Sequence, residues 1–242
     1  MEISKETIIG ELVAKDYRTA SVFEKNDLDF CCNGAKSIGE ACDKLQVSTD
    51  KVIQELNDVL TQKAENSNDY NSWPLDLLAD YIQKKHHRYV EARIPEIKPL
   101  LAKINQVHGG RHPELARVEQ LFNEAAGEMA MHMKKEELML FPKIRKMEEA
   151  KQNGSAMGGM PLEGSIKTLM MEHDDQGDKF HEIKHLTNNY TSPADGCNTY
   201  RVTLALLKEF EDDLHLHIHL ENNILFPKSI KLEEELAVVQ QS

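Results

Sequence analysis

Apolar residues recur every three or four positions along four long segments of the chain, a spacing that predicts amphipathic helices. These segments cover about residues 74–95, 113–150, 161–188 and 194–236. Pro95 and Pro99 interrupt the regular pattern of the first segment, so we expect that helix to lose its regularity there. Four amphipathic helices with short connections are typical of a four-helix bundle, and the expected fold class is all-α.

A smaller region precedes the bundle and has a different pattern. Residues 1–63 contain short helical stretches, one of them capped by residues 48–50, and a turn-like break over residues 29–34 separates them. The stretch over residues 64–72 is polar and lacks periodicity. We therefore predict a small helical domain (1–63), a linker (64–72) and a four-helix bundle (73–242).

The second and fourth helices carry one motif twice, a histidine followed four residues later by a glutamate: His132 with Glu136, and His217 with Glu221. Both pairs continue the apolar stripe of their helix, which on the second helix ends at Met139. Side chains four residues apart on a helix lie about 5–6 Å apart at Cβ, so each pair can reach one metal cluster. A buried carboxylate without a partner costs several kcal/mol, and a multivalent cation would stabilise both glutamates at once.

The helical phase also separates the remaining histidines. His86 on the first helix and His173 on the third lie on apolar stripes and are expected to point into the core. His87, His215 and His219 fall among charged and amide residues and are expected to face solvent. Four inward histidines and two inward glutamates, from four helices, thus predict a shared metal site.

A second interpretation of the same residues needs no metal. Each glutamate could pair with its neighbouring histidine as a buried ion pair, but His86 and His173 would then have no role, and buried pairs rarely add stability. His108 stands just before Gly109-Gly110, a position equally compatible with a seventh ligand and with a surface loop. The spacing alone does not decide between these two roles for His108.

Composition limits the function classes. The 242 residues carry a formal charge of −12, and no basic stripe is available to meet nucleic-acid phosphates or an anionic membrane surface. No apolar run approaches the ~18 residues that span a bilayer, and the first residues lack the apolar segment of a signal peptide. We expect a cytoplasmic protein that binds neither nucleic acid nor membrane, with homodimerisation left open.

Four cysteines are too few for a disulfide scaffold and do not have zinc-site spacing. Cys31 and Cys32 are adjacent in a turn-like segment, which favours at least one reactive thiol near the surface, with inert packing as the alternative. Cys42 and Cys197 have no recognisable partner and are expected to be structural. The donor set of the bundle, carboxylate and imidazole without thiolate, favours iron or manganese, with zinc as an option.

The histidine–glutamate pairs, with their upstream helical histidines, resemble the hemerythrin-like domain. The segment Asp29-Phe-Cys-Cys-Asn-Gly34 resembles the short N-terminal domain of the repair of iron centers (RIC) family of di-iron proteins, and together the two similarities cover essentially the whole chain. The resemblance implies a hemerythrin-like bundle with two non-haem iron ions bridged by carboxylates, and an oxo bridge as an option. The iron ligands that it implies are His86, His108, His132, His173 and His217, with Glu136 and Glu221 as the bridges. Oxygen-carrying hemerythrins instead end with His-x-x-x-x-Asp, and Asn222 stands at that position here.

The same resemblance implies a role in repairing iron–sulfur clusters damaged by nitric oxide or oxidants, with iron donation as the expected mechanism. Cys31 and Cys32 would then act as a redox pair, a transient iron ligand or a docking thiol for the damaged protein. Two other functions stay open on the residues alone. One is reduction of nitric oxide at the iron centre, which would make the protein an enzyme, and the other is binding of O2 or nitric oxide by a sensor, or iron storage.

Overall fold

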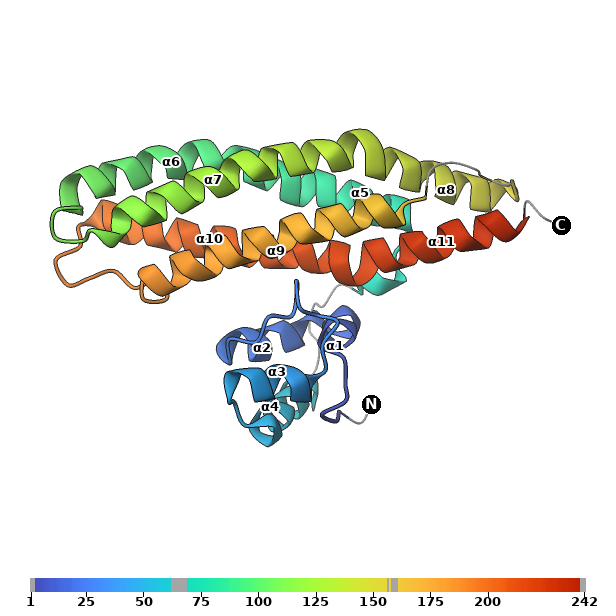
Figure 1. The fold of residues 1–242 in the computed structure, drawn as a ribbon, viewed down its shortest axis with the longest axis horizontal. Coiled ribbons are helices and arrows are strands. Elements are labelled where there is room, and N and C mark those ends of the chain that lie inside the picture. Colours follow the sequence, from blue (N-terminus) through green and yellow to red (C-terminus); the bar gives the residue numbers. More distant parts are fainter. Residues whose placement is uncertain (1–2, 62–68, 156, 158–160, 240–242) are drawn as a thin grey trace. The chain divides into compact units, whose positions relative to one another are not determined.

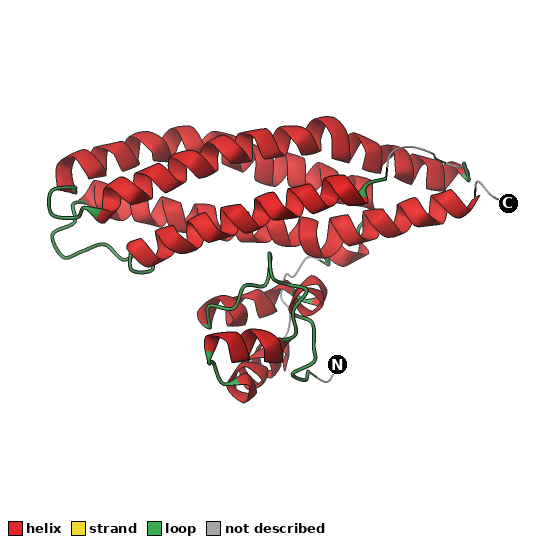
Figure 2. Ribbon diagram, in the orientation of Figure 1, coloured by secondary structure: helices red, strands yellow, loops and turns green. Residues whose placement is uncertain are grey.

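The computed structural model describes residues 3–61, 69–155, 157 and 161–239, and these are predominantly helical (Figure 2). An isolated antiparallel bridge joins Ile8 and Ser37. None of the described helices is long and apolar enough to cross a membrane. The prediction of an all-α protein built around a helical bundle is confirmed.

Along the chain the helical elements follow one another with few breaks. The N-terminal part contains α1 (Ile9–Lys15), η1 (Tyr17–Thr19), α2 (Ala20–Lys25), α3 (Ile38–Leu45) and α4 (Thr49–Thr61). The remainder contains η2 (Tyr70–Ser72), α5 (Leu75–Tyr81), η3 (Ile82–His87), α6 (Arg88–His108), α7 (Glu114–Lys135), η4 (Glu136–Leu140), α8 (Phe141–Asn153), α9 (Glu163–Leu186), α10 (Asn198–Leu220), η5 (Glu221–Leu225) and α11 (Phe226–Val239). Most of the predicted linker 64–72 lies outside the described residues, and its last part contains η2.

The chain forms two compact units, one of residues 1–78, 147–160 and 218–242 and the other of residues 79–146 and 161–217. In the second unit α6, α7, α9 and α10 run side by side as four long helices (Figure 1). Helix α7 packs against both α6 and α9. Three buried rings lie between α7, α9 and α10: Phe210 is stacked on Phe180 with 5.5 Å between centroids and meets Phe122 edge-on at 5.4 Å. This aromatic cluster forms part of the core of the bundle.

The first unit has an apolar core of its own. Helices α1 to α4 enclose four side chains with no exposed surface, namely Ile9, Phe23, Ile38 and Leu56. Helix α3 begins with a capping box, in which Ser37 and Glu40 bind each other's backbone N–H groups. The break predicted at residues 29–34 is found between α2 and α3.

Helix α6 continues through Pro95 and Pro99, where the sequence predicted a loss of regularity, and ends only at His108. Proline removes a backbone hydrogen bond and usually kinks or ends a helix. Both prolines are exposed here, so water can bind the carbonyl groups that lose their partners. The predicted break is therefore wrong. As a consequence, His108 is carried to the far end of a helix of 21 residues.

Three π-helical turns interrupt the long helices, namely η3, η4 and η5. Each turn holds one residue more than an α-helix would, which rotates the residues that follow by about 100°. Two of the turns begin at the repeated glutamates, Glu136 and Glu221, and the third ends at His87. The predicted stripe of the second helix is wrong beyond Glu136 for this reason: Met139 is 68% exposed, and Phe141 is buried in its place.

Candidate metal centre

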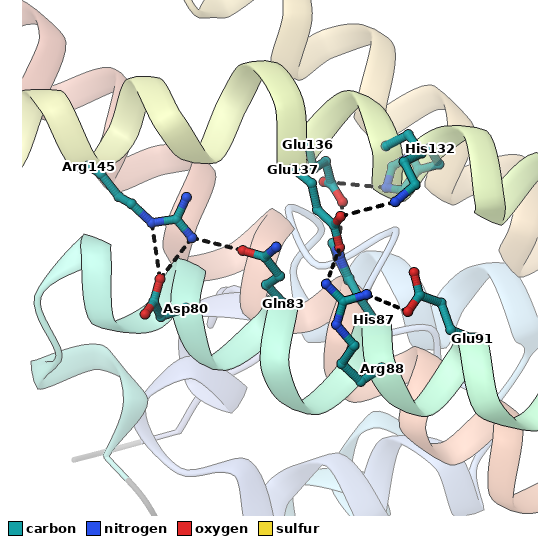
Figure 3. Close-up of polar contacts among 10 residues, drawn as sticks. Asp80, Gln83, His87, Arg88, Glu91, His132, Glu136, Glu137 and Arg145 are labelled. Carbon is teal, nitrogen blue, oxygen red and sulfur yellow. Dashed lines mark hydrogen bonds and ion pairs between the residues drawn. The ribbon is translucent and has the colours of Figure 1, made fainter.

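Glu136 lies between two histidines, with one carboxylate oxygen near each (Figure 3). Its Oε2 atom is 3.4 Å from Nε2 of His87, and its Oε1 atom is 3.4 Å from Nε2 of His132. The side chain has no exposed surface. It is placed by the start of η4, one turn beyond His132 on α7. A carboxylate with its two oxygens beside separate imidazoles is suited to bridge two cations.

Two groups of donor atoms share this carboxylate. One contains His87, Glu136 and His217, and the other contains His132, Glu136 and His173; within each group the ligand atoms lie within 4.8 Å of one another. The Nε2 atoms of His132 and His173 are 2.9 Å apart. Imidazole nitrogen and carboxylate oxygen are donors that iron, manganese and zinc accept. The residues present therefore fit a metal centre of this kind.

His87 is fully buried, and the prediction that it faces solvent is wrong. The extra residue of η3 brings both His86 and His87 to the inner side of the helix. Nδ1 of His87 is 3.0 Å from Oε1 of Glu137, which leaves Nε2 for Glu136 (Figure 3). Burial opposes ionisation of Glu137, but the hydrogen bond with His87 and the charge of Lys134 together lower its pKa. Glu137 thus orients the imidazole for a metal, as carboxylates behind ligand histidines commonly do.

His86 is also buried, but it belongs to neither group of donor atoms found among the described residues. Its ring stacks on that of His217, with 5.6 Å between centroids and 11° between planes. Its Nδ1 atom is 3.1 Å from Oδ1 of Asp213. The structure therefore favours His87 over His86 as the donor from the first helix, with His86 as the neighbour that packs against His217.

His108 lies at the opposite end of α6 from His87. The 21 residues of this helix separate the two by about 30 Å, at about 1.5 Å per residue. Nε2 of His108 is 3.2 Å from Sγ of Cys197, and its ring meets that of Tyr200 edge-on. The expectation that His108 reaches the cluster as a further ligand is therefore wrong.

Glu172, whose spacing predicts no role, positions the imidazole of His132. Its Oε2 atom is 2.9 Å from Nδ1 of His132, and Lys135 binds its other carboxylate oxygen. Burial opposes ionisation of Glu172, but the contacts with Lys135 and His132 outweigh it and lower the pKa of the carboxyl. Because Glu172 directly precedes His173, one short piece of α9 supplies both a donor and the carboxylate that orients a second donor.

Replacing Glu172 with glutamine should weaken iron binding about 10- to 100-fold, since it removes the negative charge behind His132 and mutation of such a partner typically costs this much. Competition of the iron-loaded protein with a chelator, measured as iron retained per chain, tests this. Glu182→Gln is the matched control, because Glu182 lies on the same helix and pairs with Arg117 at the surface. Equal iron retention by the two variants would contradict the positioning role.

A pocket of about 260 Å³ opens beside His132, between α7 and α9. It is lined by Gly127, Glu128, Met131, His132, Lys135, Glu172, Asp175 and Gln176. Nε2 of Gln176 donates to Oε2 of Glu128 at 2.7 Å, and Lys179 pairs with the same carboxylate at 2.8 Å. The pocket beside the predicted ligand His132 is therefore lined by three carboxylates, those of Glu128, Glu172 and Asp175.

Glu221 follows His217 by four residues, at the point where α10 passes into η5. Its side chain has no exposed surface. Glu221 belongs to the first of the two units, and its role as a second bridging carboxylate stays a prediction from the repeated spacing.

The face of the fourth helix that was expected to be solvated is covered by an N-terminal segment within the first unit. His219 is 1% exposed and packs against the rings of Tyr17 and Phe30, at centroid distances of 5.6 and 6.0 Å. Burial lowers the pKa of His219 to about 3, so its ring is neutral. Asn222 is buried as well and donates to the carbonyl of Cys31 at 3.3 Å. The prediction that His219 faces solvent is wrong because its neighbours come from a distant part of the sequence.

Cys31 and Cys32 place their Sγ atoms 3.8 Å apart, with Cys31 buried and Cys32 partly exposed. Oδ1 of Asp29 accepts the backbone N–H groups of both cysteines, at 3.0 and 2.9 Å, and the Cys31 thiol at 3.3 Å. Contact with Cys32, burial and the charge of Asp29 raise the pKa of Cys31, which keeps this thiol protonated. The three side chains form a group of donor atoms within 4.8 Å of one another, in which Cys32 is the accessible sulfur.

Known proteins resemble this chain along nearly its whole length. Residues 78–229 match the family described as the hemerythrin HHE cation binding domain, and residues 5–60 match a domain of unknown function (DUF542). A probable iron–sulfur cluster repair protein of Haemophilus influenzae is 35% identical over 221 residues, which cover 91% of this chain and 95% of that protein. The iron–sulfur cluster repair protein YtfE of Escherichia coli is 32% identical over 222 residues, covering 92% and 96%.

Proposed function

Because the chain belongs to the family of iron–sulfur cluster repair proteins with a hemerythrin cation-binding domain, we propose that it binds two iron ions and donates iron to clusters damaged by nitric oxide or oxidants. The position of Glu136 supports this most directly, since its two oxygens lie beside different histidines. Two cations sharing one carboxylate would neutralise a charge that is costly to bury alone. Carboxylate and imidazole side chains can also dissociate from a metal ion and be replaced by other ligands, which suits a centre that releases an ion.

The two irons share their ligands between them. The proposed ligands are His87 and His217 for one ion, His132 and His173 for the other, and Glu136 as the bridge. Glu221 is the proposed second bridge, since it is buried one turn beyond His217 and occupies the position of Glu136 in the repeated motif. Bound iron would supply a redox-active cation with coordination positions open to small ligands. Glu137 and Glu172 keep two of the imidazoles oriented toward the ions.

We expect the iron beside His132 to be the one transferred. The pocket borders this histidine, and Glu128, Glu172 and Asp175 line it with carboxylate oxygens, which attract divalent cations. Glu172 is shared between His132 and Lys135. A shift of Glu172 toward Lys135 would release the imidazole of His132 and loosen its hold on the ion.

The vicinal thiols are proposed to receive iron on its way to the damaged cluster. Cys32 is the accessible sulfur, and Asp29 stands beside both thiols as an oxygen donor. The carbonyl of Cys31 is tied to Asn222, the residue after Glu221, so the thiol turn is fixed to the helical turn that carries this glutamate. Thiols must stay reduced for this role, which agrees with a cytoplasmic protein.

Cys32→Ser should slow repair severalfold while leaving the iron content of the purified protein unchanged, because the thiol is a transfer group and not a ligand of the resting centre. Recovery of activity by a damaged iron–sulfur enzyme measures the repair rate. Cys197→Ser, which removes the exposed thiol of Cys197, is the control and should repair at the native rate. Equal rates for both variants would show that Cys32 takes no part in transfer.

A hydratase whose iron–sulfur cluster has been damaged by nitric oxide tests the main proposal. Incubation with the full-length protein, loaded with isotopically labelled iron, should restore hydratase activity and leave label in the hydratase. Recovery that free ferrous ion reproduces equally well, or recovery without label, would contradict donation. Nitrous oxide formed anaerobically by the reduced protein, without iron transfer, would favour nitric oxide reduction instead.

A further inference from the structure

Cys197 and His108 form a thiol–imidazole pair at the end of the bundle away from His87. Sγ of Cys197 is 3.2 Å from Nε2 of His108. The cysteine is exposed, whereas the histidine is only 4% exposed. About 30 Å of helix α6 separates this pair from His87, so its chemistry is distinct from that of the metal centre. Cys197 was expected to be structural for lack of a partner, and the structure supplies one.

The backbone around Cys197 also favours a negative charge on sulfur. Cys197 directly precedes α10, a helix of 23 residues, and the N–H groups of Thr199 and Tyr200 donate to its side chain. This is the position that an N-cap oxygen takes, beside the positive end of the helix dipole. The contact with His108 and the two N–H groups together lower the pKa of Cys197 to about 7.

Apart from the contact with Cys197, the structure shows no polar contact of the His108 imidazole with the described residues. Nδ1 of His108 is buried and has no hydrogen-bond partner. Its neighbours are the rings of Tyr200 and His112, at centroid distances of 5.4 and 6.5 Å. A buried histidine normally satisfies both nitrogens, so one whose polar contact in the structure is an exposed sulfur indicates that this contact has a function.

The charged groups around the pair are largely paired with one another. Asp195 binds Arg111 at 3.1 Å and His112 at 3.0 Å, and His112 also contacts Glu114 at 3.1 Å. Asp195, through its hydrogen bond, is the main cause of the raised pKa of His112. The hydroxyl of Tyr200 does not ionise near neutral pH, since burial raises its pKa to about 12. His108 is thus the titratable side chain in direct contact with the sulfur.

We propose that Cys197 is a reactive thiolate that forms mixed disulfides with small disulfides such as oxidised glutathione. The Cys197 sulfur attacks one sulfur of the small disulfide, a new S–S bond forms, and the old S–S bond breaks. The leaving half departs as a thiolate and takes up a proton. Cys197 is oxidised and the departing thiol is reduced, so no other reactant is needed. The product is a reversible modification directly before the N-terminus of α10.

Alkylation of the full-length, iron-loaded protein tests this. Short exposure to iodoacetamide from pH 5.5 to 9.5, with each cysteine quantified by peptide mass spectrometry, should give a midpoint near pH 7 at Cys197. An ordinary thiol has its midpoint near 8.5. His108→Asn should raise the midpoint and slow alkylation at pH 7 about fivefold. The loss of thiolate alone would slow it more, but a thiolate whose thiol has a higher pKa is the stronger nucleophile. His112→Asn, a neighbour without contact to the sulfur, should leave the midpoint near 7.

Oxidised glutathione itself provides the second measurement. One glutathionyl group should appear on Cys197 and be removed by a reductant, and it should be absent from Cys197→Ser. A native midpoint near 8.5, or glutathionylation confined to Cys32, would overturn the proposal. The midpoint of the native protein decides even if His108→Asn fails to fold. A folded His108→Asn, judged by its circular dichroism, with an unchanged midpoint would also overturn it.

Discussion

Glu136→Gln should hold less than one iron ion per chain, against the two proposed for the native protein. The amide preserves the size of the side chain but removes its charge and one of the two oxygens that lie beside His87 and His132. Both ions lose a shared ligand at once, so the effect exceeds that of removing a ligand to one ion. Metal analysis with an anaerobic optical spectrum measures the loss. The iron-dependent rise in melting temperature should shrink with it, because a bound ligand stabilises only the folded state that binds it.

Glu124→Gln is the matched control for this variant, since Glu124 lies on the exposed side of α7. It should retain two irons. Replacing both Glu136 and Glu221 with leucine should abolish iron binding and leave the helical content largely intact, which extends the test to the second proposed bridge. Two irons per chain in the double variant would exclude both carboxylates as bridges.

The second large effect distinguishes two adjacent histidines. His87→Asn should lose most of its iron, whereas His86→Asn should retain most of it. Both rings are fully buried, so the packing costs of the two changes are similar and the comparison isolates the metal contact. Nε2 of His87 is 3.4 Å from Glu136, while His86 contacts Asp213 and the ring of His217. Iron per chain and the optical spectrum of the loaded variants measure the difference.

Retention of iron by His87→Asn together with its loss from His86→Asn would reverse the assignment. Equal loss from both, in variants whose circular dichroism is native, would mean that the stack of His86 on His217 is as necessary as direct ligation. A spectrum of His86→Asn that keeps native band positions would show that the ligand set itself is unchanged.

Much of the fold, and the burial of His132 and His217, follow from the sequence for a simple physical reason. Up to Glu136 and Glu221 the helices are regular, so the 3.6-residue period predicts that His132 and His217 face the core, and both are buried. The same period fails at His87, because a π turn adds a residue that leaves no sign in the hydrophobic pattern. In the adjacent pair His86-His87, the hydrophobic pattern allows either histidine to be the metal donor. The backbone conformation of η3 determines which one is placed for that role.

Two other errors had a different origin. His219 is polar and is expected from its helical phase to face solvent, but polar side chains are also buried where another segment offers aromatic rings to pack against. His108 was assigned to the cluster by resemblance, without knowledge that α6 runs unbroken through two prolines. Neither the packing of distant segments nor the continuation of α6 through its two prolines can be deduced from a single sequence.

The three π turns lie in the helices that carry His87, Glu136 and Glu221, and each turn divides its helix into two registers. A point substitution at Met139 changes only an exposed side chain. Deleting that same residue would instead convert η4 to ordinary α-helix and turn Phe141 and all of α8 by about 100°. In this protein the number of residues in each π turn therefore matters as much as their identity for which side chains the following helix buries.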